Sequence, residues 1–285
     1  MLGIIANDGL AVVGHSLFNN FRLGLQNYFE EEFRDVANEN DLDGIDTLFI
    51  VDEHFTPHVS VWKQDAFINK LNISNIKTVV FNFEKIFDSK FPWNVDHQNK
   101  LCTIQNLIQI VSDVNDADTL NKTIINKQFL SRDTKLDHDK VDRIDRILFL
   151  GQSDKVFNPS YAYSRRYQLL EEIKQTDLPV DIVVTDRALT YREYLTKLAS
   201  YKYILNPLGT GEFVNLRFYE ALKVGCIPIQ QITLSMIPKY HELLHGCHTF
   251  IDSQYIKQIL KYDNVSPRDD FYIEDYFKEI NLKNL

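Results

Sequence analysis

Short apolar runs alternate with amphipathic stretches along most of this chain of 285 residues. Apolar runs bounded by turn residues predict buried strands, and apolar residues at helical spacing predict helices. The predicted strands lie at residues 2–6, 47–51, 77–83, 146–150, 181–185, 203–205, 227–230 and 248–251. The predicted helices lie at residues 16–38, 59–71, 101–111, 117–130, 161–174, 190–200 and 269–280. This alternation is typical of an α/β fold with parallel sheets.

A highly charged segment, residues 131–145, lacks apolar periodicity until Ile144. We interpret it as a linker between two domains. We expect a first Rossmann-like domain at residues 1–143 and a second at residues 144–265. The amphipathic tail, residues 266–285, is expected to form a C-terminal helix that packs back across both domains.

Residues 201–231 (YKYILNPLGTGEFVNLRFYEALKVGCIPIQQ) combine a short strand, a glycine loop, a helix that begins near Asn215, and a second strand. Arg217 and Glu220 are three positions apart near the helix start, where free N–H groups and the helix dipole attract an anion. A guanidinium offers a fork of donors to a phosphate, and a carboxylate accepts hydrogen bonds from two sugar hydroxyls. The pair therefore fits a nucleotide, although such pairs also occur as solvated surface pairs.

The order of strand, glycine loop, R-x-x-E helix and G-C-I-P-I resembles the donor-binding segment of GT-B glycosyltransferases. The nearest group is the exostosin-like one, and F-V-N-L-R-F-Y-E-A-L is also similar to a helix of phage DNA β-glucosyltransferases. In both groups this Glu holds the donor ribose, and the match falls on Glu220. The resemblance implies two Rossmann-like domains facing a cleft, with the nucleotide-sugar donor in residues 144–265 and the acceptor in residues 1–143.

Other residues at strand ends and helix starts of the second domain are expected to bind the donor. The strand at 146–150 ends in Gly151, where a small residue lets a phosphate approach. Arg165 and Arg166 oppose the dipole of the next predicted helix, which suggests an anion for them to neutralise, and the resemblance places such arginines at the donor diphosphate. The expected donor-binding residues are Gly151, Arg165, Arg166, Arg187, Asn206, Gly209, Gly211, Glu212, Asn215, Arg217 and Glu220.

Polar residues follow the predicted strand at 47–51, at the sheet edge where ligands bind in open α/β folds. Asp52 directly follows the strand and is the first candidate for a general base, with Glu53 second. His15, in the loop before the long helix, is the third candidate because several GT-B families place a catalytic His there. A role in capping a turn or helix is an equal alternative for each of them.

Composition narrows the function further. Residues 1–145 carry 14 Lys and Arg against 23 Asp and Glu, so the net charge of −9 falls on the first half. A polyanion such as DNA would be repelled there unless basic residues cluster. Three scattered cysteines without C-x-x-C spacing indicate a reduced compartment and no zinc site. The chain has no long apolar run, so we expect a cytoplasmic protein, bacterial or viral, without a membrane anchor.

Two kinds of cofactor are not expected. Three D-x-D sequences, at residues 41–43, 116–118 and 137–139, lie in polar stretches rather than after an apolar strand, so we expect no required metal. A G-x-G-x-x-G pattern is absent, which argues against a dinucleotide cofactor.

We therefore predict a glycosyltransferase that transfers a sugar from a UDP- or GDP-sugar to a glycan hydroxyl, with inversion and without a metal, as a monomer or weak dimer. Three alternatives stay open. One is a phage-type DNA glycosyltransferase acting on a hydroxymethylated base. Another is a non-catalytic nucleotide- or sugar-binding protein, and the third is an unrelated doubly wound enzyme such as an epimerase or hydrolase.

Overall fold

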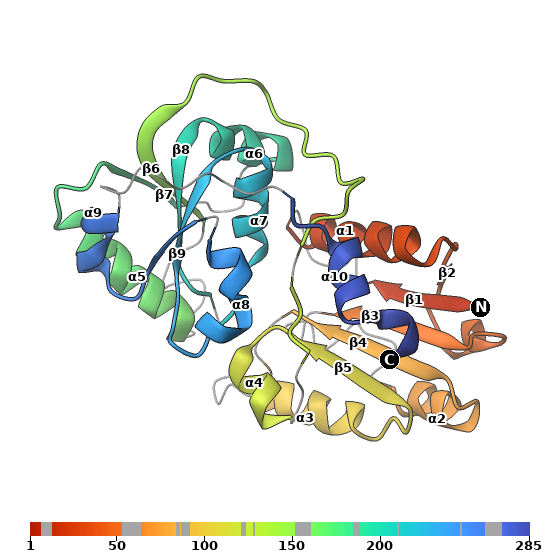
Figure 1. The fold of residues 1–285 in the computed structure, drawn as a ribbon. Helices are drawn as coiled ribbons and strands as arrows, with labels where there is room; N and C mark the ends of the chain where they lie inside the picture. The colour runs from red at the N-terminus through yellow and green to blue at the C-terminus, as the bar shows by residue number, and fades with distance from the viewer. Residues whose placement is uncertain are drawn as a thin grey trace. The chain divides into compact units, whose positions relative to one another are not determined.

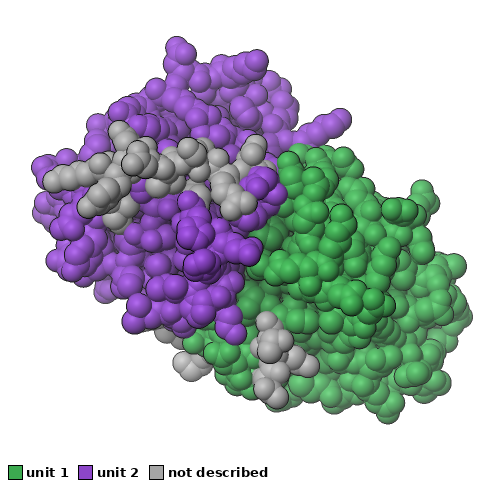
Figure 2. Space-filling model, in the orientation of Figure 1, with its two compact units in different colours: residues 1–134, 272–285 green, residues 135–271 purple. Residues whose placement is uncertain are grey.

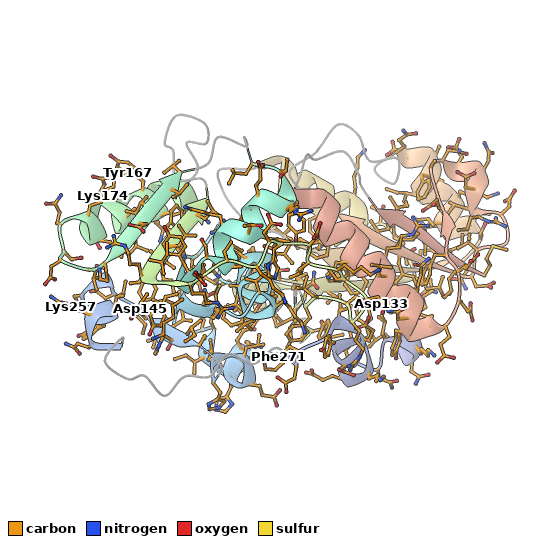
Figure 3. The ribbon with its side chains drawn as sticks, turned by 90° about the horizontal axis from the view of Figure 1, so that it is seen from above. Asp133, Asp145, Tyr167, Lys174, Lys257 and Phe271 are labelled. Carbon is orange, nitrogen blue, oxygen red and sulfur yellow. The ribbon has the colours of Figure 1, made fainter. Side chains whose placement is uncertain are left out.

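The computed structural model describes residues 1–6, 13–52, 64–83, 86, 92–120, 124–127, 129–151, 161–184, 189–209, 211–245, 247–259 and 270–285. The chain divides into two compact units, which Figure 2 shows in different colours. Unit 1 comprises Met1–Thr134 and Tyr272–Leu285, and unit 2 comprises Lys135–Phe271. Asp133 and Phe271, labelled in Figure 3, stand close to the two places where the chain passes between the units.

Unit 1 is built on a parallel sheet of five strands in the order β2-β1-β3-β4-β5 (Figure 1). Its strands are β1 (Leu2–Ala6), β2 (Arg34–Asp35), β3 (Thr47–Asp52), β4 (Lys77–Asn82) and β5 (Leu107–Val111). Its helices are α1 (Val13–Phe29), η1 (Glu39–Leu42), α2 (Asp65–Ile73), α3 (Pro92–Leu101), α4 (Val114–Thr119), α10 (Ile273–Glu279) and η4 (Leu282–Asn284).

Helices cover both faces of this sheet. Apolar side chains of α2 and the end of α3 share a core with β3 and β4 on one face. The other face is aromatic, because Phe21 of α1 and Phe277 of α10 both pack on Phe81, with ring centroids 5.3 Å and 5.8 Å away. The C-terminal helix α10 lies beside α1 and so completes the core of unit 1 (Figure 1).

Unit 2 repeats the plan with a parallel sheet in the order β10-β9-β8-β6-β7. Its strands are β6 (Ile144–Gly151), β7 (Val180–Val184), β8 (Tyr201–Asn206), β9 (Ile227–Gln231) and β10 (His248–Phe250). Its helices are α5 (Tyr161–Lys174), α6 (Tyr191–Ala199), α7 (Leu216–Lys223), α8 (Ile237–Leu244), η3 (Ser253–Tyr255) and α9 (Ile256–Ile259).

The alternation of side chains along β6 separates two cores in unit 2. Ile147 and Phe149 face α5 and α9, whereas Leu148 and Leu150 face α6 and α7. Figure 3 labels Tyr167 and Lys174 on α5 and Lys257 on α9. The helices α6 and α7 therefore lie on the same face of the sheet, next to each other.

The strands of both sheets have the same kind of order along the chain. In each, the chain places the second strand on one side of the first and the later strands on the other side. The order reverses between β1 and β3 in unit 1 and between β6 and β8 in unit 2. In open α/β sheets, ligands bind outside the carboxyl ends of the strands at such a switch point.

The structure confirms the predicted α/β class with two parallel-sheet units, and most of the predicted strands. The helix expected at 101–111 is wrong, because α3 ends at Leu101 and the apolar run LIQIV pairs with β4 as strand β5. The helix expected at 117–130 is also wrong, since α4 ends at Thr119 and the chain then makes an extended bridge from Ile125 to Val111.

Two further helices differ from the prediction. The helix expected at 16–38 ends at Phe29, because Glu30 adopts a left-handed backbone with φ of 58°. Helix α8 was not predicted, although Tyr240 and Leu243 lie at helical spacing and are buried. The predicted domains at 1–143 and 144–265, the crossing helix at 266–285 and their roles stay a prediction.

Candidate functional site

Helix α7 begins beside the switch point of unit 2. It follows β8 through the loop 207–215, and Asn215 occupies its N-cap position with an extended backbone. Among the described residues, the Asn215 side chain makes no capping hydrogen bond to the first N–H groups of α7. At the other end Gly225 adopts a φ of 79°, a left-handed conformation that favours glycine after a helix.

The guanidinium of Arg217 lies against the end of β6. Its Cζ is 5.8 Å from the centre of the Phe149 ring. A Cβ at Gly151 would stand 2.5 Å from Nη2 and 3.1 Å from Cζ, so only a glycine leaves room for the guanidinium in this position. Arg217 Nε and Nη1 are buried and have no hydrogen-bond partner among the described residues.

Glu220 lies one turn further along α7, and its side chain is only 2% exposed. Its Oε1 accepts a hydrogen bond of 2.6 Å from the Tyr191 hydroxyl, and its Oε2 accepts one of 2.9 Å from the Tyr194 hydroxyl. Burial raises the pKa of Glu220, while the two phenols and Arg217 act in the opposite direction. Burial of its hydroxyl raises the pKa of Tyr194 well above its ordinary value.

The loop after β8 is fixed by side chains of β9. Asn206 Nδ2 donates to Gln230 Oε1 at 2.6 Å, and Leu208 N donates to Gln231 Oε1 at 3.1 Å. Arg166 of α5 is 8% exposed, and its Nη2 donates to the Leu208 carbonyl at 3.4 Å. The buried cation therefore reaches the same loop that leads into α7.

Glu212 in this loop is tied to the segment after β9. Its Oε2 accepts a hydrogen bond of 2.8 Å from Thr233 Oγ1 and another from Ser235 Oγ. These bonds fix the carboxylate of Glu212 beside the loop.

Four buried polar atoms on β8 and at the start of α7 have no hydrogen-bond partner among the described residues. They are Arg217 Nε and Nη1, Asn206 Oδ1 and Asn215 Oδ1. Buried polar atoms in native proteins are almost always satisfied by protein, water or a ligand. Two donors of a cation and two amide oxygens thus form a polar site at the β6/β8 switch point.

The structure brings most of the predicted donor-binding residues to this edge. Gly151 contacts the Arg217 guanidinium, and a Cβ at Gly209 would lie 3.5 Å from Arg166 Nη2. Arg165 is exposed on α5, unlike Arg166, and Gly211 is buried in the loop. Arg187 lies outside the described residues.

The predicted catalytic residues belong to unit 1. Asp52 ends β3 at the β1/β3 switch point, and its side chain is outside the described set, as is all of Glu53. His15 lies in the first turn of α1 rather than in a loop, because α1 begins at Val13. Its side chain is also outside the described set.

The site residue that the sequence did not indicate is Tyr194. It lies three positions after Tyr191 in a helix with a capping box, Thr190 to Glu193, and this spacing is the signal that could have revealed it. Tyr191 begins the same helix, and its hydroxyl also binds Glu220.

The carboxylates of the D-x-D sequences have local partners. Asp41 accepts hydrogen bonds from the backbone of Ala37 and Asn38, and Asp116 accepts one from Ile86 N. Asp137 and Asp139 both form ion pairs with Arg192. In the part of the chain that the structure describes, no three His, Cys, Asp or Glu side chains are grouped to hold a metal, and no helix is long and apolar enough to cross a membrane.

No protein-family description matches the chain, and no curated protein matches it in sequence. Solved structures do resemble it. An alpha,alpha-trehalose-phosphate synthase (UDP-forming) from Burkholderia vietnamiensis superimposes with a TM-score of 0.45 at 10% identity, over 95% of this chain and 79% of that one. TarM does so with a TM-score of 0.46 at 12% identity, over 84% of this chain and 55% of TarM.

A UDP-glucosyltransferase from Polygonum tinctorium superimposes with a TM-score of 0.36 at 9% identity, over 97% of this chain and 79% of that one. These similarities concern the path of the backbone. The class that the fold itself defines is a protein of two parallel, doubly wound α/β units.

Proposed function

We propose that the chain is a GT-B glycosyltransferase that transfers a sugar from a nucleoside-diphosphate sugar to a hydroxyl of a glycan. The observation that carries the proposal is the arrangement on α7. Nε and Nη1 of Arg217 have no hydrogen-bond partner in the described part of the chain, and one turn away two phenols hold the carboxylate of Glu220. An anion receptor and a receptor for two hydroxyls at this spacing match a diphosphate and a ribose.

Each part of the site has a role in this proposal. Arg217 and the N–H groups at the start of α7 bind the diphosphate, with Arg166 behind the loop as a second cation. Positive groups aimed at the leaving diphosphate stabilise the charge that develops there in the transition state, so the reaction needs no metal. Glu212 and the loop 207–213 bind the hydroxyls of the transferred sugar.

The acceptor and the base belong to unit 1 in this proposal. Asp52 ends β3, where the polar edge of a parallel sheet faces a ligand, and so serves as the base that takes the proton from the acceptor hydroxyl. Attack from the face opposite the leaving diphosphate inverts the anomeric centre. Glu53 and His15 are the second and third candidates for the same role.

Isothermal titration calorimetry with UDP, GDP, dTDP and inorganic pyrophosphate tests the donor site. We expect one ribonucleotide to bind, and Glu220→Gln to weaken it about tenfold to a hundredfold, because hydrogen bonds to a charged acceptor are lost. Pyrophosphate should bind both proteins equally. The matched control is Asp181→Asn, since Asp181 also accepts a hydrogen bond from a tyrosine, besides one from Arg146, but lies near the amino end of β7, away from the carboxyl ends of the strands.

Two results would overturn the proposal. One is the failure of every nucleotide to bind the wild-type protein. The other is equal binding by wild type and Glu220→Gln. Binding without turnover of a radiolabelled sugar donor, on a panel of glycans and on hydroxymethylated DNA, would instead indicate a nucleotide-binding protein.

The base is tested separately. Asp52→Asn should lower kcat about a hundredfold or more while leaving donor affinity within a factor of about two, because general-base catalysis contributes to the chemical step only. Unchanged turnover would remove Asp52, and the same measurement on Glu53→Gln and His15→Asn would then decide between the remaining candidates.

A further inference from the structure

Two tyrosines of α6 bind the two oxygens of one carboxylate. Tyr191 and Tyr194 are three residues apart, and their rings are nearly parallel, with an interplanar angle of 16° and centroids 6.0 Å apart. One hydroxyl reaches each oxygen of Glu220. Because two donors act on two oxygens, they fix both the position and the plane of the carboxylate.

The start of α6 holds these tyrosines in place. Thr190 caps the helix, and Glu193 Oε2 accepts hydrogen bonds of 2.7 Å from both the Thr190 N–H and the Thr190 hydroxyl. Tyr191 is the first residue of the capped helix and Tyr194 stands one turn later. The helix start therefore has a single well-defined register with respect to Glu220.

The hydrogen bonds leave acceptor capacity on Glu220. An ionised carboxylate has about four acceptor sites, two on each oxygen. The phenols use one site on each oxygen, which leaves one site on each for a ligand with two neighbouring hydroxyls. A protonated carboxyl would instead carry an O–H donor and could not accept from such a pair at both oxygens.

We propose that Tyr191 and Tyr194 are positioning residues that keep Glu220 ionised and oriented to accept both hydroxyls of a ribose. This inference rests on the proposed function, since it assigns the preparation of the ribose receptor to α6. It adds that the nucleoside part of the donor is recognised through a three-residue unit in which only Glu220 touches the ligand.

The charges around Glu220 give the expected direction of the effect. The groups that shift its pKa downward are Tyr191 and Tyr194 from α6 and Arg217 from α7, and burial shifts it upward. Replacing either phenol by phenylalanine removes a donor but keeps the ring, so the pKa of Glu220 rises further. Nucleotide affinity should then fall at neutral pH and recover as the pH is raised.

The test uses Tyr191→Phe and Tyr194→Phe in the chain of 285 residues, with two measurements. The first is a carbon-13 NMR titration of the side-chain carboxyl of Glu220 without ligand, assigned by its loss in Glu220→Gln. The second is calorimetry with UDP, GDP and pyrophosphate from neutral to alkaline pH. Tyr201→Phe is the matched control. It removes a hydroxyl that donates to Asp181 at 2.8 Å, near the amino ends of the strands and away from Glu220.

We expect each variant to raise the titration midpoint of Glu220 and to weaken the nucleotide about tenfold at neutral pH, with a smaller loss at alkaline pH. Pyrophosphate affinity should not change, and Tyr201→Phe should alter neither measurement. A merely structural role would lower the melting temperature and leave both measurements as in the wild type.

The inference is overturned if the wild type binds a nucleotide and both phenylalanine variants bind it equally well. It is also overturned if the Glu220 midpoint does not move, or if pyrophosphate affinity falls by the same factor. Failure of the wild type to bind any nucleotide refutes the proposed function, and the inference with it. That result is distinct from the others because it appears before any substitution is made.

Discussion

The contact between Gly151 and Arg217 makes a sharp prediction, because a single methyl group should displace the guanidinium. In Gly151→Ala the new Cβ would stand 2.5 Å from Arg217 Nη2 and 3.1 Å from its Cζ. Both atoms belong to the far end of a flexible side chain, so the guanidinium can rotate away. Gly151 also has a positive φ of 157°, where a residue with a Cβ is strained, so the free energy of unfolding should fall by about 1–3 kcal/mol.

Displacement of the guanidinium should also weaken ligand binding. A displaced guanidinium loses charged hydrogen bonds to the diphosphate, which are worth about 1.5–3 kcal/mol. This corresponds to about a tenfold to hundredfold weaker affinity for pyrophosphate and for the nucleotide alike. Calorimetry measures the affinities, and thermal unfolding measures the stability. Gly44→Ala in unit 1 is the control for backbone strain, because Gly44 also has a positive φ, of 80°, and a Cβ there would meet no described atom within 4 Å.

A double-mutant cycle decides whether Gly151 acts through Arg217. If it does, Gly151→Ala should weaken binding in the wild type but cause no further loss in Arg217→Ala, since the group it displaces is already gone. Additive losses in the double variant would show that Gly151 contributes to binding independently of Arg217, and would refute the reasoning. Unchanged affinity in Gly151→Ala would refute it as well.

Two more predictions concern stability. The pKa of Glu220 is raised in the folded state. The contribution of Glu220 to the free energy of unfolding is therefore greatest below the pKa that it has in the unfolded chain, and is lost as the pH rises through its pKa in the folded state. Urea denaturation measures the free energy of unfolding of the wild type and of Glu220→Gln. The difference between the two should decrease as the pH rises. A difference that does not change with pH would contradict the burial of an ionisable Glu220. Phe277→Ala should lower the free energy of unfolding by about 3–5 kcal/mol, because the ring of Phe277 is fully buried against Phe21 and Phe81. Chemical denaturation measures this loss. A loss below about 1 kcal/mol would show that α10 does not complete the core of unit 1.

Local signals account for the parts of the fold that the sequence predicted well. Helix α5 spans the predicted residues 161–174, and α6 begins at Tyr191, one residue after the predicted start at Thr190. Helix α7 begins after Asn215, and Gly225 follows its last turn. Each of these boundaries depends on residues within one helical turn, so the chain itself carries the information.

The wrong predictions concern segments whose structure depends on contacts with distant parts of the chain. The run LIQIV is too short for its periodicity to distinguish a strand from a buried helix. It forms a strand because it pairs with β4. The core of unit 1 depends on α10, which comes from the far end of the chain. Gly24 shows the same limit, since a Cβ there would overlap the side chain of Ile273 in α10 and no local signal explains that glycine.

The candidate site was only partly predictable for the same reason. Arg217 and Glu220 stand out because their chemistry and spacing are visible within one helix. The burial of Glu220 is not visible there, because it follows from α6 lying beside α7. The role of Gly151 likewise depends on a contact with a residue far along the sequence.

The segment before β6 makes hydrogen bonds and ion pairs with both helices of the site, α6 and α7. Arg143 donates to the carbonyl of Val224 at 2.7 Å and to that of Gly225, which satisfies the C-terminal carbonyls of α7 and places a cation at the negative end of its dipole. On α6, Arg192 pairs with Asp137 and Asp139, and Thr196 Oγ1 accepts from Asp139 N at 3.0 Å.

A buried carboxylate is tolerated only when its donors are held in place, since the cost of burying it unpaired is several kcal/mol. Loosening the segment before β6 should therefore weaken nucleotide binding although no residue in contact with the ligand has changed. We expect Arg143→Ala to lower the free energy of unfolding by about 1.5–3 kcal/mol and to weaken nucleotide binding severalfold, measured by denaturation and calorimetry. Asp145→Asn is the control, because its 3.5 Å ion pair with Lys202 touches neither helix. If Arg143→Ala lost stability but kept full affinity, α6 and α7 would hold Glu220 without help from this segment.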